Sequence, residues 1–109
     1  MLPKALRLTT KEIDALSKGT SVFGPIVSAR IGISNKTKFA VSVSKKVLPD
    51  AVDRNKVRRK VYAAVGTILT SIKEGVSIMI MPKKEFLDMP VNDIARELSR
   101  LFEKARLIR

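Results

Sequence analysis

The stretch AVDRNKVRRKVYAAVGTILTSI, residues 51–72, decides the fold of this 109-residue chain. Its apolar residues recur at helical spacing, which predicts one long helix with a buried stripe. The stripe consists of Val57, Val61, Ala64, Val65, Ile68 and Ile72. Five cations and one amide stand between Arg54 and Lys60. At about 100° per residue, Asn55 and Arg59 lie opposite the stripe, so the helix is predicted to be buried on one side and basic on the other.

Strands are predicted on both sides of this helix. From Thr37 to Ser44, apolar residues occupy every second position, as in a half-buried strand. Residues 76–81 are apolar at nearly every position, which is typical of a central strand covered on both faces. Strand, helix and strand form a β-α-β crossover. If the two strands are parallel, a right-handed connection is the default.

The N-terminal third is predicted to hold a helix and one interrupted strand. The helix begins at a cap at Thr9, runs through Ser17 and ends at Gly19. Residues 21–33 are rich in β-branched residues, and Gly24-Pro25 predicts a break or bulge within that strand.

A hairpin turn at Asn35-Lys36 is predicted to join this strand to the next one. A last helix, over about residues 91–106, buries Ile94, Leu98, Leu101, Phe102 and Ala105. The predicted order is αββαβα, which indicates an α+β fold. We expect a two-layer α-β sandwich with a small mixed sheet, in one domain of residues 1–109.

The charge of the chain is large and unevenly placed. The net charge is +12 and the isoelectric point is about 10.5. Residues 36–60 hold nine cations and two acids, a net +7. Such a concentration of one sign predicts a polyanionic partner. No apolar run is long enough to span a membrane, and no signal peptide is recognised, so a soluble cytoplasmic protein is expected.

The composition argues against catalysis by the protein alone. Histidine and cysteine are absent, which removes the commonest general base, the commonest metal ligand and all thiolate chemistry. The closest pair of acids, Asp50 and Asp53, stands at the start of the long helix. There the two carboxylates favour the helix dipole and are expected to be dipole partners instead of catalysts.

RNA is favoured over DNA as the partner. Asn and Arg on the long helix could contact base edges in a major groove. However, five cations on its first turns suit phosphate docking better, and no helix-turn-helix precedes them. Phosphates of a compactly folded RNA are therefore the better match.

Two motifs resemble those of the bacterial ribonuclease P protein component. V-S-V-S-K-K-V, residues 41–47, is similar to a family strand that ends V-S-K-K-V. R-N-K-V-R-R, residues 54–59, is similar to the family's R-N-R-x-K-R helix. Arg7-Leu8 is similar to its N-terminal R-L. The pair of motifs at this spacing is specific, whereas either one alone would be weak.

The resemblance implies a role in tRNA processing. The family's protein is the small subunit of a ribonucleoprotein endonuclease, a hydrolase that removes the 5′ leader of precursor tRNA. The large ribonuclease P RNA is implied to hold the active site and its Mg²⁺ ions, with one protein per RNA. No catalytic or metal-binding residue is then expected in this chain. The family's crossover is left-handed, which the resemblance implies here as well.

The charge pattern and the resemblance together predict the RNA-binding set. It consists of Lys45, Lys46, Arg54, Asn55, Lys56, Arg58, Arg59 and Lys60. Arg54 projects near the edge of the buried stripe, but at the helix start, where it can clear the core. In the family, a cleft between the sheet and the first helix contacts the leader. Ser42 and Ser44 either lie on that cleft or are ordinary sheet positions.

The chain departs from the family pattern in its aromatic residues. The family's first helix usually carries aromatic side chains that stack on leader bases, whereas this chain offers Ile13 and Leu16. Phe23 or Phe39 could replace that stacking, although each is expected in the core. Tyr62-Ala63 stands where the family often has Arg-Glu, so the basic face is expected to end earlier.

Two other classes of protein share the size and charge of this chain. One is a non-enzymatic ribosomal or assembly-type protein that binds structured RNA, which would not support cleavage of precursor tRNA. The other is a DNA-binding regulator, which would favour one duplex sequence and dimer symmetry.

Overall fold

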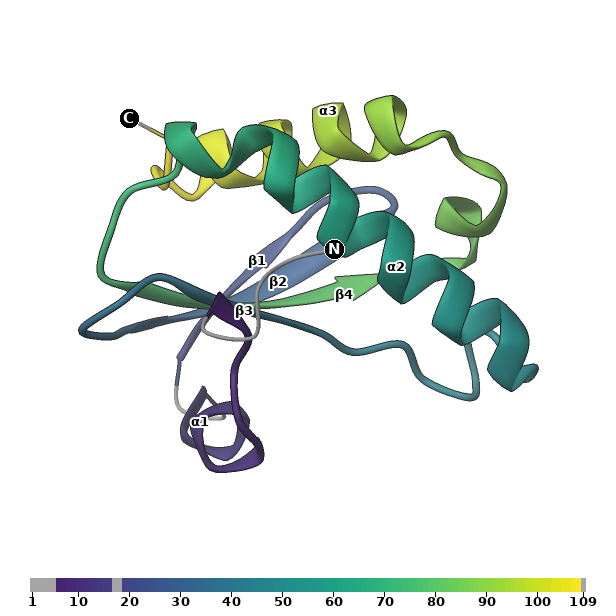
Figure 1. Cartoon of the computed structure of the whole chain (residues 1–109), viewed down its shortest axis with the longest axis horizontal. Coiled ribbons are helices and arrows are strands. Elements are labelled where there is room, and N and C mark those ends of the chain that lie inside the picture. The colour runs from purple at the N-terminus through teal and green to yellow at the C-terminus, as the bar shows by residue number, and fades with distance from the viewer. Residues whose placement is uncertain (1–5, 17–18, 109) are drawn as a thin grey trace.

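The computed structural model describes residues 6–16 and 19–108, which form one sheet with helices on both faces. The strands are β1 (Thr20–Phe23), β2 (Val27–Ile33), β3 (Lys38–Val41) and β4 (Val76–Pro82). The α-helices are α1 (Thr10–Ala15), α2 (Ala51–Ile68) and α3 (Val91–Lys104), and the short 3-10 helices are η3 (Leu69–Ser71) and η4 (Lys84–Asp88). Helices α2 and α3 cover one face of the sheet, and α1 lies on the opposite face (Figure 1).

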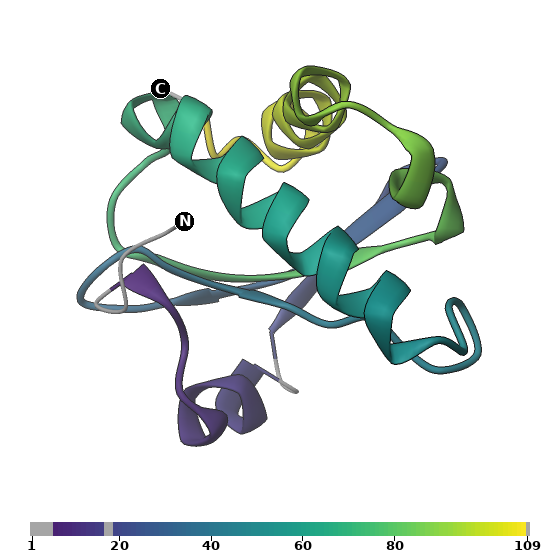
Figure 2. The same ribbon diagram turned by 45° about the vertical axis from the view of Figure 1, so that its right-hand side comes forward.

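The sheet is mixed, with the strand order β1-β2-β4-β3. β3 is parallel to β4, whereas the other neighbouring pairs are antiparallel. Helix α2 connects the two parallel strands, so β3, α2 and β4 form the predicted β-α-β crossover. The predicted α+β class with a small mixed sheet is therefore confirmed. In Figure 2, α2 (teal) runs diagonally over the sheet, on the same side of the sheet as α3 (green to yellow).

The predicted order αββαβα lacks one strand. Residues 20–33 form a hairpin of β1 and β2, in which Phe23 pairs with Ser28, and the observed order is αβββαβα. Of the predicted break or bulge at Gly24-Pro25, the structure shows a break, at which the chain reverses between β1 and β2. The Gly24 N–H donates to the Val27 carbonyl at 2.9 Å, and a Cβ at Gly24 would lie 2.9 Å from that oxygen. Only glycine fits so close an approach of backbone to backbone.

The predicted hairpin at Asn35-Lys36 is wrong. β2 and β3 are not neighbours, because β4 lies between them. The reason is the apolar character of β4, whose Ile78 and Ile80 have no exposed surface and occupy the centre of the sheet. Alternation along two strands cannot show that a third strand, 35 residues later, separates them.

β3 also ends earlier than predicted. The Ser42 N–H still donates to the Ile80 carbonyl at 2.9 Å, but the chain then turns, and Val47 and Leu48 both donate to the Ser44 carbonyl at 3.1 Å. In a parallel ladder the next hydrogen bond would run from the N–H of residue 82, on β4, to the Ser42 carbonyl. Pro82 has no N–H, so the ladder ends there.

The core lies between the sheet and the layer of α2 and α3. All predicted stripe residues of the long helix are buried except Ile68, which is half-buried, as is Ala105 near the end of α3. The core residues with 1% exposure or less are Val27, Ala29, Phe39, Val57, Val61, Ala64, Val65, Ile78, Ile80, Phe86, Ile94, Leu98 and Phe102. Burying such side chains contributes about 1.5–3 kcal/mol each, so α2 is held firmly along its whole apolar side.

Helix α1 is held by a capping box and an ion pair. The Thr9 N–H donates to Glu12 Oε1 at 3.0 Å, and the Glu12 N–H donates to Thr9 Oγ1 at 3.3 Å. Lys38 Nζ donates to Glu12 Oε2 at 3.1 Å. The Thr9 N–H and then Lys38 hold the pKa of Glu12 below its usual value. The predicted cap at Thr9 is confirmed, whereas the predicted passage through Ser17 lies outside the described residues.

Lys60 joins α2 to the segment that follows β4. Its Nζ donates to the carbonyls of Leu87 at 2.7 Å and Met89 at 2.9 Å. Both carbonyls lie at the end of η4, whose Phe86 is fully buried. The charge of Lys60 therefore serves the fold.

Helix α3 ends two residues before the predicted boundary, in a Schellman-type cap. The Arg106 N–H donates to the Glu103 carbonyl at 2.9 Å, and the Leu107 N–H donates to the Phe102 carbonyl at 2.8 Å. This cap requires a left-handed residue, and Arg106 has φ of 60°. The left-handed conformation costs an L side chain about 1–2 kcal/mol.

Replacing Arg106 by glycine is expected to raise the free energy of unfolding by about 0.5–1 kcal/mol, because glycine adopts this φ freely but loses more chain entropy on folding. Urea unfolding measures the effect. Arg106→Ala removes the same charge but keeps the Cβ, so it is the matched control. Equal free energies of unfolding for the two variants would contradict this explanation.

Lys60→Met is expected to lower the free energy of unfolding by about 1–3 kcal/mol, because two carbonyls lose a charged donor. Lys56→Met, at an exposed position of the same helix, is expected to change it by less than about 0.5 kcal/mol. Urea unfolding of both variants tests the difference. Equal losses would mean that the two hydrogen bonds of Lys60 contribute nothing.

Candidate nucleic-acid interface

The start of α2 is built by a carboxylate cap. Asp50 is the N-cap, and its Oδ1 accepts from the Val52 N–H at 2.9 Å. Asp53 lies in the first turn, where a negative charge favours the helix dipole. Both acids thus lie at the start of the helix, as predicted.

Arg54 holds the loop that leads into α2. Its Nη1 donates to the carbonyls of Leu48 at 2.9 Å and Pro49 at 2.8 Å. The Leu48 side chain is buried in the core, so Arg54 fixes the backbone between the Lys45–Lys46 turn and the helix. The prediction that Arg54 clears the core is correct, but its guanidinium is turned to the loop and is only half-exposed.

The remaining predicted residues lie on the first turns of α2 and on the turn before it, and together we call them the outer basic surface. This surface consists of Lys45, Lys46, Asn55, Lys56, Arg58 and Arg59. All are exposed except the half-buried Arg58, whose Nη1 donates to Asn55 Oδ1 at 2.8 Å. Of the eight predicted RNA-binding residues, the structure thus brings six to the surface and uses Arg54 and Lys60 within the fold.

Two residues that the charge pattern did not single out complete this surface. The segment before α1 lies beside β3, where the Leu8 N–H donates to the Phe39 carbonyl at 2.7 Å. This contact places the Arg7 guanidinium over the ring of Tyr62, 6.0 Å from its centroid. Helical spacing from Asn55 could have indicated Tyr62. The approach of Arg7 could not have been found, because it depends on pairing at the sheet edge.

Arg7 and Tyr62 help to form a hollow of about 480 Å³ at the edge of the outer basic surface. We call it the basic hollow; its described lining residues are Arg7, Asn55, Arg58, Arg59 and Tyr62. They include three guanidinium groups and no carboxylate. The Nε of Arg7 is buried and has no hydrogen-bond partner in the described part of the chain.

The face of the sheet opposite α2 and α3 is the second candidate surface. The register places Arg30, Met79 and Ala40 in one row across this open face, with Ser28 and Met81 in the next. The Nε of Arg30 is buried and lacks a hydrogen-bond partner among the described residues.

The proposed leader-binding residues are placed differently from one another. Ser42 is exposed beside the open face, directly after β3. Ser44 belongs to the turn, where its Oγ accepts from the Val47 N–H at 3.2 Å. Phe39 is buried, as expected, but Phe23 is 66% exposed, contrary to the expectation that it belongs to the core. Phe23 is exposed because it is the last residue of the edge strand β1 and shares the open face with Ser28.

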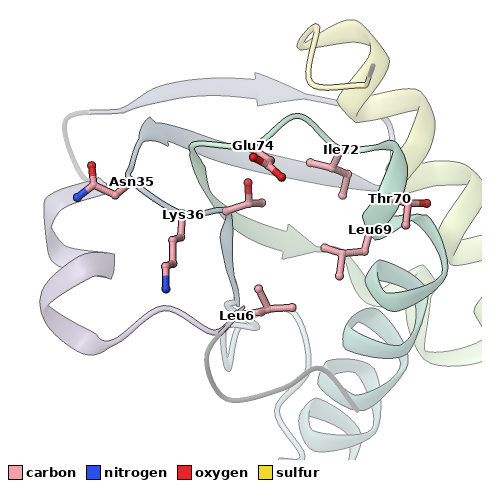
Figure 3. A pocket seen from close by; sticks show the side chains of 8 residues that line it. Leu6, Asn35, Lys36, Leu69, Thr70, Ile72 and Glu74 are labelled. Carbon is pink, nitrogen blue, oxygen red and sulfur yellow. The ribbon is translucent and has the colours of Figure 1, made fainter.

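A further hollow, of about 530 Å³, lies between the β2–β3 loop and the end of α2. Figure 3 shows Leu6, Leu69 and Ile72 on one side of it and Lys36 on the other, while Asn35 points away. The lining carries one cation and one acid, Lys36 and Glu74. It therefore lacks the concentration of positive charge that marks the basic hollow.

The described residues offer neither a metal-binding cluster nor a membrane-spanning helix. No group of three or more His, Cys, Asp or Glu side chains lies close enough there to hold a metal ion. Within the same part of the chain, no helix has the length and apolarity needed to cross a bilayer.

The sequence is similar to named ribonuclease P protein components. The protein from Pseudanabaena sp. is 27% identical over 113 residues, which covers 99% of this chain and 97% of that protein. The protein from Rippkaea orientalis is 32% identical over 72 residues, 66% of this chain. The chain spans only 57% of the length of that second relative.

The fold is similar to solved bacterial RNase P proteins. The Staphylococcus aureus protein superposes with a TM-score of 0.80 at 22% identity, covering 97% of this chain and all of that one. The Thermotoga maritima protein gives 0.77 at 19% identity, covering 90% and 96%. These likenesses concern the fold. A model of the Ribonuclease P family matches residues 2–106, nearly the whole chain, and the protein therefore belongs to the ribonuclease P protein family.

Proposed function

We propose that this chain is the protein subunit of ribonuclease P, which assists a catalytic RNA in removing the 5′ leader from precursor tRNA. One observation carries the proposal: a member of this family presents Asn55, Lys56, Arg58 and Arg59 on a helix whose other side is buried, and Lys45 and Lys46 on the turn before it. The homologues that support it are themselves named ribonuclease P protein components. The role is that of an accessory subunit of an endoribonuclease.

The outer basic surface is the proposed docking site for the RNA subunit. Its cations neutralise backbone phosphates and release counterions, which favours binding at low salt. Arginine forks on Arg58 and Arg59 can each pair with two phosphate oxygens, whereas Lys56 acts as a point charge. Because α2 is fixed in the core, these groups are already ordered before the RNA arrives. Docking therefore costs less conformational entropy than it would for a flexible basic tail.

The open face of the sheet is the proposed contact for the single-stranded leader. Arg30 supplies a donor that has no partner among the described residues, and Ser42 supplies an exposed hydroxyl directly after β3. Phe23 offers an exposed ring on the same face. Aromatic rings stack on unpaired bases with little sequence preference, so Phe23 takes the part that aromatic residues of the first helix play in relatives.

Hydrolysis is assigned to the RNA. Attack of water on the phosphodiester leaves the phosphate on the 5′ end of the mature tRNA and a 3′ hydroxyl on the leader. The described residues provide no carboxylate cluster that suits magnesium, so no step is attributed to a metal held by this chain. The protein instead supplies positive charge and holds both RNAs in position. Action in the cytoplasm, on RNA and not on DNA, with one protein per RNA, completes the proposal.

Arg59→Gln is expected to weaken binding to ribonuclease P RNA and to lower the slope of log K against log salt by about one, because one phosphate contact is lost. Filter binding across a salt titration measures both quantities. Arg96→Gln is the matched control, since Arg96 is an exposed cation on α3, outside the outer basic surface. Equal effects of the two substitutions would contradict the assignment of Arg59.

The function itself is tested by cleavage of a precursor tRNA with a bacterial ribonuclease P RNA at low magnesium. Adding this protein is expected to stimulate release of the 5′ leader, and the protein alone is expected to cleave nothing. Tight binding to structured RNA without stimulation would instead indicate a ribosomal or assembly-type protein.

A further inference from the structure

The basic hollow combines an aromatic ring with guanidinium groups, a combination that the rest of the outer basic surface lacks. Asn55, Arg58, Arg59 and Tyr62 stand at positions i, i+3, i+4 and i+7 of α2, which share one face of a helix. The fifth lining residue, Arg7, comes from the sheet edge. The hollow thus places an aromatic ring beside three guanidinium groups.

The side chain of Arg7 has a hydrogen-bond donor without an acceptor among the described residues. This donor, Nε, is shielded from solvent, and a buried donor that stays unpaired is unfavourable. The guanidinium lies 6.0 Å from the centroid of the Tyr62 ring, at the outer limit of a cation–π contact. Pairing at the sheet edge thus positions Arg7, but its Nε has no hydrogen-bond partner among the described residues. Because Arg7 lines the hollow, an anionic group that enters it would meet this guanidinium.

We propose that the basic hollow receives one unpaired nucleotide of the RNA on which the protein docks. The base stacks on Tyr62, and the adjoining phosphate accepts from Arg7 with Arg58 or Arg59. This inference rests on the proposed function, since it concerns the same RNA partner. It adds a site within that interface, a nucleotide class and two contact residues, Arg7 and Tyr62.

An unpaired nucleotide fits the hollow better than a duplex does. A paired base turns its flat face to its neighbours in the stack, so only phosphates would reach a ring on the protein surface. A nucleotide outside a helix presents both its phosphate and its base face, as is usual where proteins bind RNA through aromatic and arginine side chains. A volume of about 480 Å³ lies within the ordinary range for small-ligand sites.

Affinity for ribonuclease P RNA separates the contributions of ring and charge. Tyr62→Leu is expected to weaken binding about ten-fold without changing the salt slope, because stacking is lost and no phosphate contact is removed. Tyr62→Phe keeps the ring and is expected to bind like the parent. Arg7→Gln is expected to weaken binding and to reduce the salt slope by about one. Thermal unfolding identifies any variant whose loss reflects instability, and the Phe variant and Arg7→Gln remain informative in that case.

Tyr62 can also be observed directly, because the chain has one tyrosine and no tryptophan. Isotope-labelled tyrosine gives one set of ring signals in an NMR spectrum. Adding a ten-nucleotide single-stranded RNA is expected to shift these signals upfield, and Arg7→Gln is expected to reduce the shift.

The outcomes separate failure of the basic hollow as a nucleotide site from failure of the proposed function. Unmoved ring signals at RNA concentrations that saturate the protein in filter binding, or full affinity of Tyr62→Leu for ribonuclease P RNA, would overturn the basic hollow as a nucleotide site and leave the proposed function intact. Failure of the unaltered protein to bind any RNA would overturn both.

Discussion

The packing of α2 against the sheet is the contact on which the rest of this structure depends. Val57, Val61 and Val65 have no exposed surface, and each contributes about 1.5–3 kcal/mol through burial. Since the apolar stripe fixes the rotation of the helix, it also fixes which residues face solvent. Asn55 and Arg59 face outward because Val57 and Val61 hold the opposite side of the helix against the sheet. Core packing and the basic surface are thus two sides of one helix.

The cations of this helix divide between the fold and the surface. Arg54 fixes the loop before the helix, and Lys60 fixes the segment after β4, each through two backbone carbonyls. Carbonyls attract positive charge as phosphates do, so a run of cations is suited to both tasks. Arg58 and Arg59 lie between Arg54 and Lys60 on the same helix and face solvent.

The two faces of the sheet serve different purposes because they are covered unequally. Two long helices close one face, whereas α1 has six residues and closes only part of the other. Leu16 sits over Gly32, where a Cβ would come within 2.7 Å of its Cδ2. The remaining open face holds Arg30 and Phe23, groups that a closed core would exclude or pair.

The class of fold, the long helix, its buried stripe and most of the outer basic surface could be predicted from the order of residues alone. Those features follow from the 3.6-residue period and from local charge, which act within one element. Tertiary structure decided what depends on segments far apart in the chain. It placed β4 between β2 and β3, turned Gly24-Pro25 into a hairpin, and directed Lys60 to carbonyls 27 and 29 residues away. It also brought Arg7 to Tyr62, because pairing at a sheet edge joins residues by backbone hydrogen bonds that leave no pattern in the side chains.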